Sequence, residues 1–306
     1  MRRTATAAGW LLAAALLSSV SFAQGSSSQE GGLSATLATI KSTHVVRLGF
    51  RESSPPFSFL DQANRPIGYS LELCGAVVDE IGATIDTPDL KIEYVKVTSD
   101  DRILAIVDKK IDLECGSTTA NFERRKQVAF SPLMFVAGTK LMVTRGSTAT
   151  ALADLKGKTI VVTKGTTNEQ AIQAANAKSA LGLKIVTADD HEQSYKMLAD
   201  GKVDAFATDD ILLYGLIAHH KAEATMKVVG DYLSYDPYGI MFRKGEPELA
   251  AAVERAFRKL ATNHDLLPLY QKWFVARLPT GERLNVALSP QLEESFKVLD
   301  ESGTNN

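Results

Sequence analysis

The sequence predicts an α/β protein of two lobes, and three observations lead to this prediction. Of the 306 residues, 45% are hydrophobic and 23% are charged, which supports a packed core and excludes a disordered or fibrous chain. Without an N-terminal leader, the chain has room for two domains of about 150 residues each. Short β-rich segments alternate with helical segments, and this alternation starts again halfway along the chain.

The N-terminus has the three parts of a secretory signal. Arg2 and Arg3 form a cationic start, residues 10–17 (WLLAAALL) are apolar, and Ser21-Phe22-Ala23 supplies small residues for cleavage. The apolar run is shorter than the roughly 20 residues that cross a bilayer. We therefore expect a signal peptide over residues 1–23, followed by a flexible Gly/Ser-containing segment over residues 24–43.

The first half of the chain predicts a βαβαβ order. Val45–Phe50 (VVRLGF) is typical of a strand, and Ser70 is placed to cap the helix LELCGAVVDEI. Residues 91–97 alternate as a strand, Ser99 is placed to cap the next helix, and residues 111–115 form a third strand.

The second half repeats the pattern. Thr167 and Glu169 lie in a sequence that matches a capping box, TNEQ, at the start of a helix. A long amphipathic helix is expected near the C-terminus, over residues 247–264. The strands expected here lie over residues 158–163, 184–187, 203–208 and 238–242.

Alternating strands and helices favour largely parallel sheets with helices on their faces. We expect a first lobe of residues 44–137 together with 233–306, and a second lobe of residues 138–232. Two hinge strands, near residues 136–140 and 232–238, would join the lobes. Because ligands bind beyond the carboxyl ends of strands in open α/β sheets, we expect a site between the lobes.

Composition and motifs exclude several functions. The formal charge is −2, and −4 without Arg2 and Arg3, so no basic field exists to bind nucleic acid. Residues 157–159 (GKT) end like a phosphate loop, but Leu152 replaces its first glycine. There is no HExxH or GxSxG motif and no paired cysteine cluster, so we predict no metal, no cofactor and no catalytic residues.

The two cysteines, Cys74 and Cys115, lie far from the leader and therefore cannot carry the lipid of an anchored lipoprotein. In an oxidising compartment they can form a disulfide, whose loop would stabilise the fold by roughly 4 kcal/mol. Two buried free thiols are the alternative.

Several longer phrases carry a resemblance to a known family. The segment CGSTTANFERRKQVAFSPLMF (residues 115–135) and DLKGKTIVVTKGTT (residues 154–167) resemble the family 3 bacterial extracellular solute-binding proteins. The phrases HVVRLGFRESSPPFSF, TSDDR, ADDHEQS and ATDDILL are similar to the glutamate/aspartate-binding branch. The resemblance extends from residue 45 to the C-terminal region. Ser70 departs from it, because the family often has an acidic residue there.

The resemblance implies the type II periplasmic binding protein fold and a function. A monomer in the periplasm, not embedded in the membrane, would capture acidic L-amino acids and deliver them to the permease subunits of an ABC transporter. A dehydratase-like enzyme of the same fold and a ligand sensor are the alternatives. An enzyme would need a general acid or base at the substrate, and His191 is the one candidate.

The resemblance also implies roles for nine residues. Arg124 would bind the ligand α-carboxylate with two parallel hydrogen bonds, and Asp209 would accept from the α-ammonium. With Arg51 and Arg102, these residues give an expected empty-site charge of about +2, suited to a ligand of net charge −1. The helpers expected at the α-carboxylate are Ser117, Thr119 and Thr167; those expected at the distal carboxylate are Arg51, Ser99, Arg102 and His191.

Each of these residues also has a simpler interpretation. Arginines on helices are usually solvated surface charges, His191 can lie in solvent or cap a loop, and Asp209 can neutralise a helix N-terminus.

Overall fold

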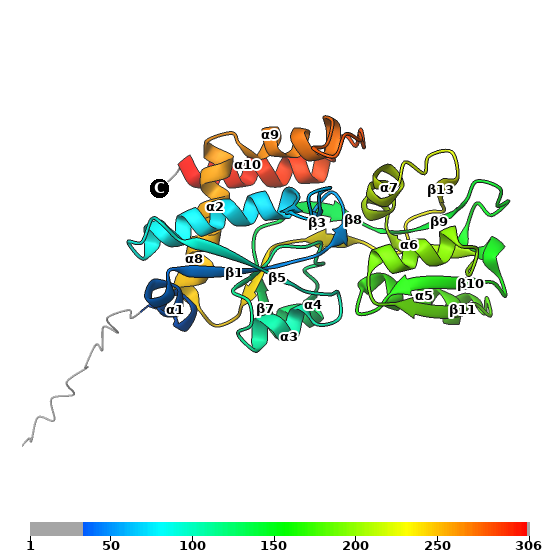
Figure 1. Cartoon of the computed structure of the whole chain (residues 1–306), viewed down its shortest axis with the longest axis horizontal. Helices are drawn as coiled ribbons and strands as arrows, with labels where there is room; N and C mark the ends of the chain where they lie inside the picture. Colours follow the sequence, from blue (N-terminus) through cyan, green and yellow to red (C-terminus); the bar gives the residue numbers. More distant parts are fainter. Residues whose placement is uncertain (1–32, 305–306) are drawn as a thin grey trace, which may run out of the picture. The chain divides into compact units, whose positions relative to one another are not determined.

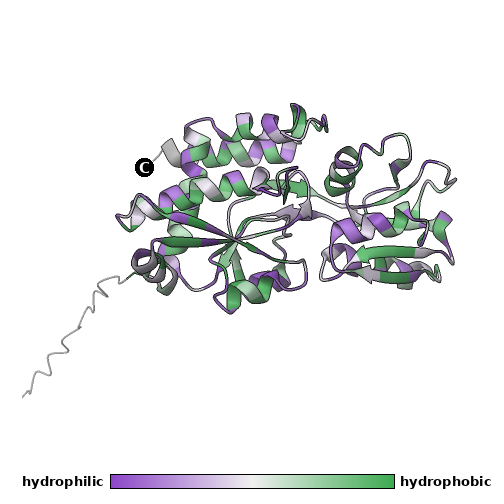
Figure 2. Cartoon of the chain, in the orientation of Figure 1, coloured by the Kyte–Doolittle hydropathy of each residue, from purple (hydrophilic) through white to green (hydrophobic). Residues whose placement is uncertain are grey.

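The computed structural model describes residues 33–304 (Figure 1). The predicted signal peptide and residues 24–32 of the predicted flexible segment lie outside the described residues. Two five-stranded sheets organise the fold, and hydrophobic residues concentrate on their strands (Figure 2). We call each sheet with the helices packed on it a lobe.

The first lobe contains a mixed sheet in which four of the five strands run in one direction. Strand β1 pairs in parallel with β5 and β6, and β15 is antiparallel to both β6 and β7. The strands in spatial order are β5 (Lys91–Lys96), β1 (Val45–Phe50), β6 (Leu113–Glu114), β15 (Met241–Arg243) and β7 (Val128–Phe130).

The second lobe repeats this arrangement. Strand β10 pairs in parallel with β11 and β12, and β9 is antiparallel to both β12 and β13. In each sheet the fourth position is therefore held by the single reversed strand. The strands in spatial order are β11 (Lys184–Ala188), β10 (Thr159–Thr163), β12 (Ala205–Asp209), β9 (Thr139–Thr144) and β13 (Met226–Val229).

Helices cover both sheets. In α8 the buried residues recur at helical spacing, and this face packs against α2 and α10. The first lobe has α1 (Ala35–Thr43), α2 (Tyr69–Thr84), α3 (Arg102–Val107), α4 (Phe122–Arg125), α8 (Pro247–Thr262), α9 (Leu266–Tyr270) with a π-helical turn (Gln271–Val275), and α10 (Pro290–Thr304). The second lobe has a 3₁₀ turn (Leu152–Leu155), α5 (Thr167–Ser179), α6 (His191–Ala199) and α7 (Asp210–His219).

The chain passes between the two sheets twice. Strand β8 (Phe135–Ala137) leads into β9, and β14 (Asp236–Tyr238) follows β13 and leads back towards β15. The two strands pair antiparallel as a separate ribbon, with Asp236 opposite Ala137. Three further short strands, β2 (Ser53–Ser54), β3 (Ser58–Leu60) and β4 (Pro66–Ile67), form a small antiparallel sheet after β1.

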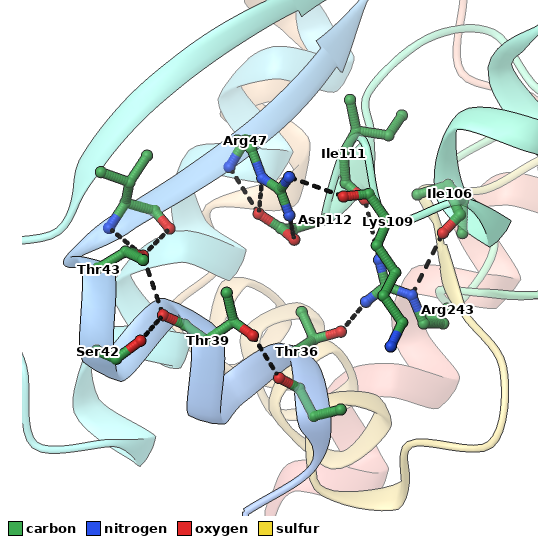
Figure 3. Close-up of polar contacts among 12 residues, drawn as sticks. Thr36, Thr39, Ser42, Thr43, Arg47, Ile106, Lys109, Ile111, Asp112 and Arg243 are labelled. Carbon is green, nitrogen blue, oxygen red and sulfur yellow. Dashed lines mark hydrogen bonds and ion pairs between the residues drawn. The ribbon is translucent and has the colours of Figure 1, made fainter.

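The prediction of a flexible segment over residues 24–43 is wrong for its second part, because α1 is folded onto the first lobe. Leu37 and Ile40 are fully buried. The Glu246 carboxylate accepts hydrogen bonds from the Thr36 N–H and hydroxyl at 3.1 and 2.9 Å, which satisfies the start of the helix. Figure 3 shows Arg243 reaching Thr36 and two main-chain carbonyl groups.

Three predicted helix caps are also wrong. Ser70 lies inside α2, and its hydroxyl donates to the Gly116 carbonyl at 2.8 Å. Asp101 precedes α3 and exchanges hydrogen bonds with Thr98, so Ser99 is not a cap. Thr166, not Thr167, caps α5 by accepting from the Glu169 N–H. In each case a neighbouring residue, Gly68, Asp101 or Thr166, occupies the N-cap position instead.

Two predicted strands are shorter than expected. Residues 111–115 contain only the two-residue strand β6, and residues 238–242 are interrupted between β14 and β15. The Cys74–Cys115 disulfide is present and joins α2 to the residue after β6.

Candidate functional site

Three buried arginines follow three strands of the first lobe. Arg51 comes directly after β1, Arg102 begins α3 after β5, and Arg124 lies in α4 after β6. Their exposed fractions are 1%, 2% and 7%, so none of them is the solvated surface charge that an arginine usually is. The carboxyl ends of these parallel strands meet at one edge of the sheet, and the three guanidinium groups gather there.

The arginines act on one another electrostatically. Burial, followed by the charge of Arg102, lowers the pKa of Arg51 to about 10 and that of Arg124 to about 9. Burial also lowers the pKa of Arg102. All three guanidinium groups remain charged at neutral pH, and like charges brought this close require nearby negative groups.

Several buried polar atoms at this edge have no hydrogen-bond partner within residues 33–304. They are Nη1 and Nη2 of Arg51, Nε of Arg102, Oγ of Ser99 and Oε1 of Glu114. Native proteins leave few buried polar groups without a partner. Four of these five atoms can donate, so an anionic group would satisfy them.

Arg124 connects the two lobes. Its guanidinium donates to the Thr119 carbonyl at 2.9 Å and to the Gly165 carbonyl of the second lobe at 3.2 Å. The Asn121 side chain caps α4 by accepting from the Arg124 N–H at 2.9 Å, which fixes the start of the side chain. The hydroxyl groups of Thr119 and Thr167, one from each lobe, lie 3.1 Å apart.

Gly165 marks a close approach between the lobes. Its backbone has φ = +75°, and a Cβ at this position would lie 2.7 Å from the Asp100 Cα. Next to it, Lys164 forms an ion pair with Asp100 at 2.9 Å. Only glycine fits this position, so the two lobes meet here with no side chain between them.

Asp209 ends β12 and is buried, with an exposed fraction of 3%. It accepts hydrogen bonds from the Tyr238 hydroxyl and, at 2.7 Å, from the Asn168 amide. Burial raises the pKa of Asp209 well above its usual value, and the charge of Asp236 adds to this rise. A cation placed beside this carboxylate would be strongly favoured, because it would offset the cost of burial.

His191 begins α6 and is buried within the site. Its Nδ1 lies 2.7 Å from the Thr163 hydroxyl, and Asp190, not His191, caps the helix. Burial and the charges of Arg51 and Arg102 lower the pKa of His191 well below its usual value. The ring is therefore neutral at physiological pH and able to donate one hydrogen bond.

The nine predicted site residues are thus brought to one region from both lobes. Ser99, Ser117 and Thr119 are buried in the loops that follow β5 and β6, the Thr119 carbonyl accepts from Arg124, and Thr167 is half-buried at the start of α5.

Sequence reasoning missed two buried carboxylates, and the expected site charge of about +2 is wrong for this reason. Glu114 is fully buried at the end of β6, and Asp236 is 1% exposed on β14. Asp236 accepts from the Thr119 hydroxyl at 3.1 Å. With Asp209, three carboxylates formally balance the three arginines. The second acidic residue of the predicted strand IDLEC (residues 111–115) was the available signal for Glu114.

No helix within residues 33–304 has the length and apolar character needed to cross a membrane. No group of three or more His, Cys, Asp or Glu side chains there could hold a metal ion.

Comparisons with known proteins add to this geometry. The sequence profile of the bacterial extracellular solute-binding proteins, family 3, matches residues 46–276. The chain is 39% identical to an L-glutamate/L-aspartate-binding protein of Pseudomonas aeruginosa, over 86% of this chain and 87% of that protein. It is 34% identical to a glutamate/aspartate import solute-binding protein of Escherichia coli K12, over 100% of this chain and 99% of that protein. A crystal structure of a mutant of ArgBP from T. maritima is similar with a TM-score of 0.70 and 26% identity, covering 78% of this chain and 98% of that chain.

Proposed function

Because the chain belongs to the bacterial extracellular solute-binding proteins, family 3, we propose that it is the substrate-binding component of an ABC transporter for L-glutamate and L-aspartate. It captures the amino acid between its two lobes in the periplasm and delivers it to the membrane permease. It acts as a monomer and catalyses no reaction on the ligand. The names of the two curated relatives support the choice of ligand.

The observation that carries the proposal is the convergence of three buried arginines with Asp209. A dicarboxylic amino acid has two carboxylates and one ammonium group. Arg124 binds the α-carboxylate through its remaining N–H groups, helped by Ser117, Thr119 and Thr167. Asp209 accepts from the ammonium, and its carboxylate is then paired with a charge.

The side-chain carboxylate is bound at the unpartnered donors of Arg51, Ser99 and Arg102. Neutral His191 completes this subsite, and its ring is held there by the contact between Nδ1 and the Thr163 hydroxyl at 2.7 Å. A glutamine amide cannot balance the two guanidinium groups, so neutral ligands bind more weakly.

The lobes open and close about the two segments that connect the sheets, near residues 136–140 and 232–238. Closure brings Arg124 to Gly165 and Lys164 to Asp100, as in the conformation described above. Ligand contacts made by both lobes stabilise this closed form.

Isothermal titration calorimetry over a panel of L-amino acids tests the proposal. We expect L-glutamate and L-aspartate to bind with micromolar or tighter affinity, about −8 kcal/mol or better, and L-glutamine to bind at least tenfold more weakly. NMR of the same mixtures should show unchanged ligand. Equal affinity for glutamine, or the appearance of a product, would contradict the proposal.

A further inference from the structure

Glu114 is a buried carboxylate to which the function described above gives no role. It ends β6 with no exposed surface. Its Oε2 accepts from the Thr118 hydroxyl at 2.6 Å, and its Oε1 has no hydrogen-bond partner among the described residues. It also forms no direct ion pair there, although a buried carboxylate is costly unless positive charge lies near.

The surrounding backbone holds Glu114 in place. A Cβ on Gly116 would lie 2.3 Å from Glu114 Oε1 and 3.0 Å from the Arg51 Cγ, so the two side chains come together over this glycine. The disulfide fixes Cys115, and Ser70 fixes the Gly116 carbonyl. The position of the carboxylate relative to Arg51 is therefore set before any ligand arrives.

Glu114 is the leading negative charge acting on both Arg51 and Arg102. Asp101 is exposed and Asp190 is half-exposed, so solvent screens their effect on the same arginines. Asp209 also acts on Arg102, and Glu114, Asp236 and Asp209 act on Arg124, so Arg51 is the arginine of the site whose one buried counter-charge is Glu114 among the described residues. Neutral His191 adds no charge to this group.

We propose that Glu114 is a specificity-determining residue that sets the charge of the ligand side chain accepted by the protein. The two arginines of the distal subsite carry +2, and Glu114 reduces this to +1. One positive charge matches the singly charged carboxylate of glutamate or aspartate and leaves a doubly charged group unmatched. This inference rests on the proposed function, because it assumes that the ligand side chain lies at Arg51 and Arg102.

Two amino acids of nearly the same shape test the role of charge alone. L-homocysteate ends in a sulfonate of charge −1, and O-phospho-L-serine ends in a phosphate of charge close to −2 at pH 8, since its second pKa is about 6. We expect the wild-type protein to bind homocysteate at least tenfold more tightly than phosphoserine at pH 8. In Glu114→Gln the glutamine side-chain oxygen can still accept the hydrogen bond from Thr118. The distal subsite of this variant carries a charge of +2, so the preference for homocysteate over phosphoserine should fall at least tenfold.

Glu52→Gln is the matched control. Glu52 follows Arg51 in the chain and pairs with Lys96 at 2.6 Å, but its side chain is exposed. The Glu52→Gln substitution removes the same charge from the protein as Glu114→Gln, but at an exposed position. The preference for homocysteate over phosphoserine should therefore stay within twofold of the wild-type value. A preference that Glu114→Gln leaves unchanged, or that both variants change equally, would overturn the proposal.

A second measurement applies if Glu114→Gln does not fold. Calorimetric titrations of the wild-type protein with each analogue, at pH 7 in two buffers, then measure the proton uptake on binding. Phosphoserine should bind with the uptake of about one proton more than homocysteate, and equal uptake overturns the proposal. If neither analogue binds, Glu114→Gln must raise the preference for L-glutamate over L-glutamine at least tenfold. If the wild-type protein does not bind L-glutamate, this result would instead refute the proposed function itself.

Discussion

The two lobes share one strand order but contribute different groups to the site. The first lobe supplies all three arginines, and the second supplies Asp209 and His191. The first lobe also holds the disulfide and a cluster of aromatic rings, in which Phe57 and Tyr238 lie 5.1 Å apart. Positive charges kept close together need a rigid support, whereas in the proposed function the second lobe moves onto the ligand. If that function holds, the difference assigns preorganisation to the first lobe and closure to the second.

The largest effect is expected from removing the disulfide. Cys74→Ser with Cys115→Ser should lower the free energy of unfolding by roughly 4 kcal/mol, because the unfolded chain regains the entropy of the closed loop. Thermal unfolding with and without a reducing agent measures this. The reducing agent should destabilise the wild-type protein but not the double variant, and an equal Tm for both proteins would show that the first lobe needs no such support.

Arg102→Met tests the charges of the first lobe directly. It should weaken L-glutamate binding about a hundredfold, the equivalent of about 3 kcal/mol, because the ligand carboxylate loses a charged donor in a buried site. Arg65→Met is the control, because Arg65 is an exposed arginine paired with Asp61. Calorimetry on both variants, with circular dichroism to confirm folding, checks the result; unchanged affinity in Arg102→Met would refute the assignment.

Asp209→Asn tests the second lobe, and here stability and binding should change in opposite directions. The pKa of Asp209 is raised in the folded protein, so its stabilising contribution is complete below the unfolded pKa of about 3.9 and is lost as the pH rises through the folded pKa. At pH 7 the ligand-free variant should therefore melt about 2–4 °C higher than the wild-type protein.

The same variant should bind L-glutamate at least tenfold more weakly, since the ammonium loses its counter-charge. Scanning calorimetry at pH 4 and pH 7, together with titration calorimetry, measures both effects. A lower Tm at pH 7 with unchanged affinity would show that Asp209 is a structural residue.

The smallest effect is expected at the exposed contact between the lobes. Lys164→Met removes the ion pair with Asp100 and should weaken ligand binding two- to fivefold, because exposed ion pairs contribute less than about 1 kcal/mol. The difference from wild type should disappear in 1 M salt. A larger effect that persists in salt would mean that this pair, and not the ligand, holds the lobes together.

Much of the fold could be predicted because local patterns determine it. The β1 strand was predicted with its observed bounds because VVRLGF has strong β propensity, and four of five strands in each sheet run in one direction, as alternation of strands and helices implies. The helix caps at Ser70, Ser99 and Thr167 were wrong because several capping residues lie close together in each segment. Only the tertiary contacts decide which of them faces the helix end.

The arginines of the site could be proposed from their positions after strands and from the family resemblance. Glu114 and Asp236 could not, because each lies in a segment that was assigned another role, a core strand and a hinge. Their importance comes from burial beside groups that are distant in sequence. For the same reason the site charge could not be counted from the sequence.

The measurement that tests the central claim most directly is a crystal structure of the protein with L-glutamate. We expect the ligand α-carboxylate within hydrogen-bond distance of Arg124, its ammonium at Asp209, and its side-chain carboxylate at Arg51 and Arg102. A ligand bound elsewhere on the molecule, or one bound with these three arginines turned away from both of its carboxylates, would contradict the account.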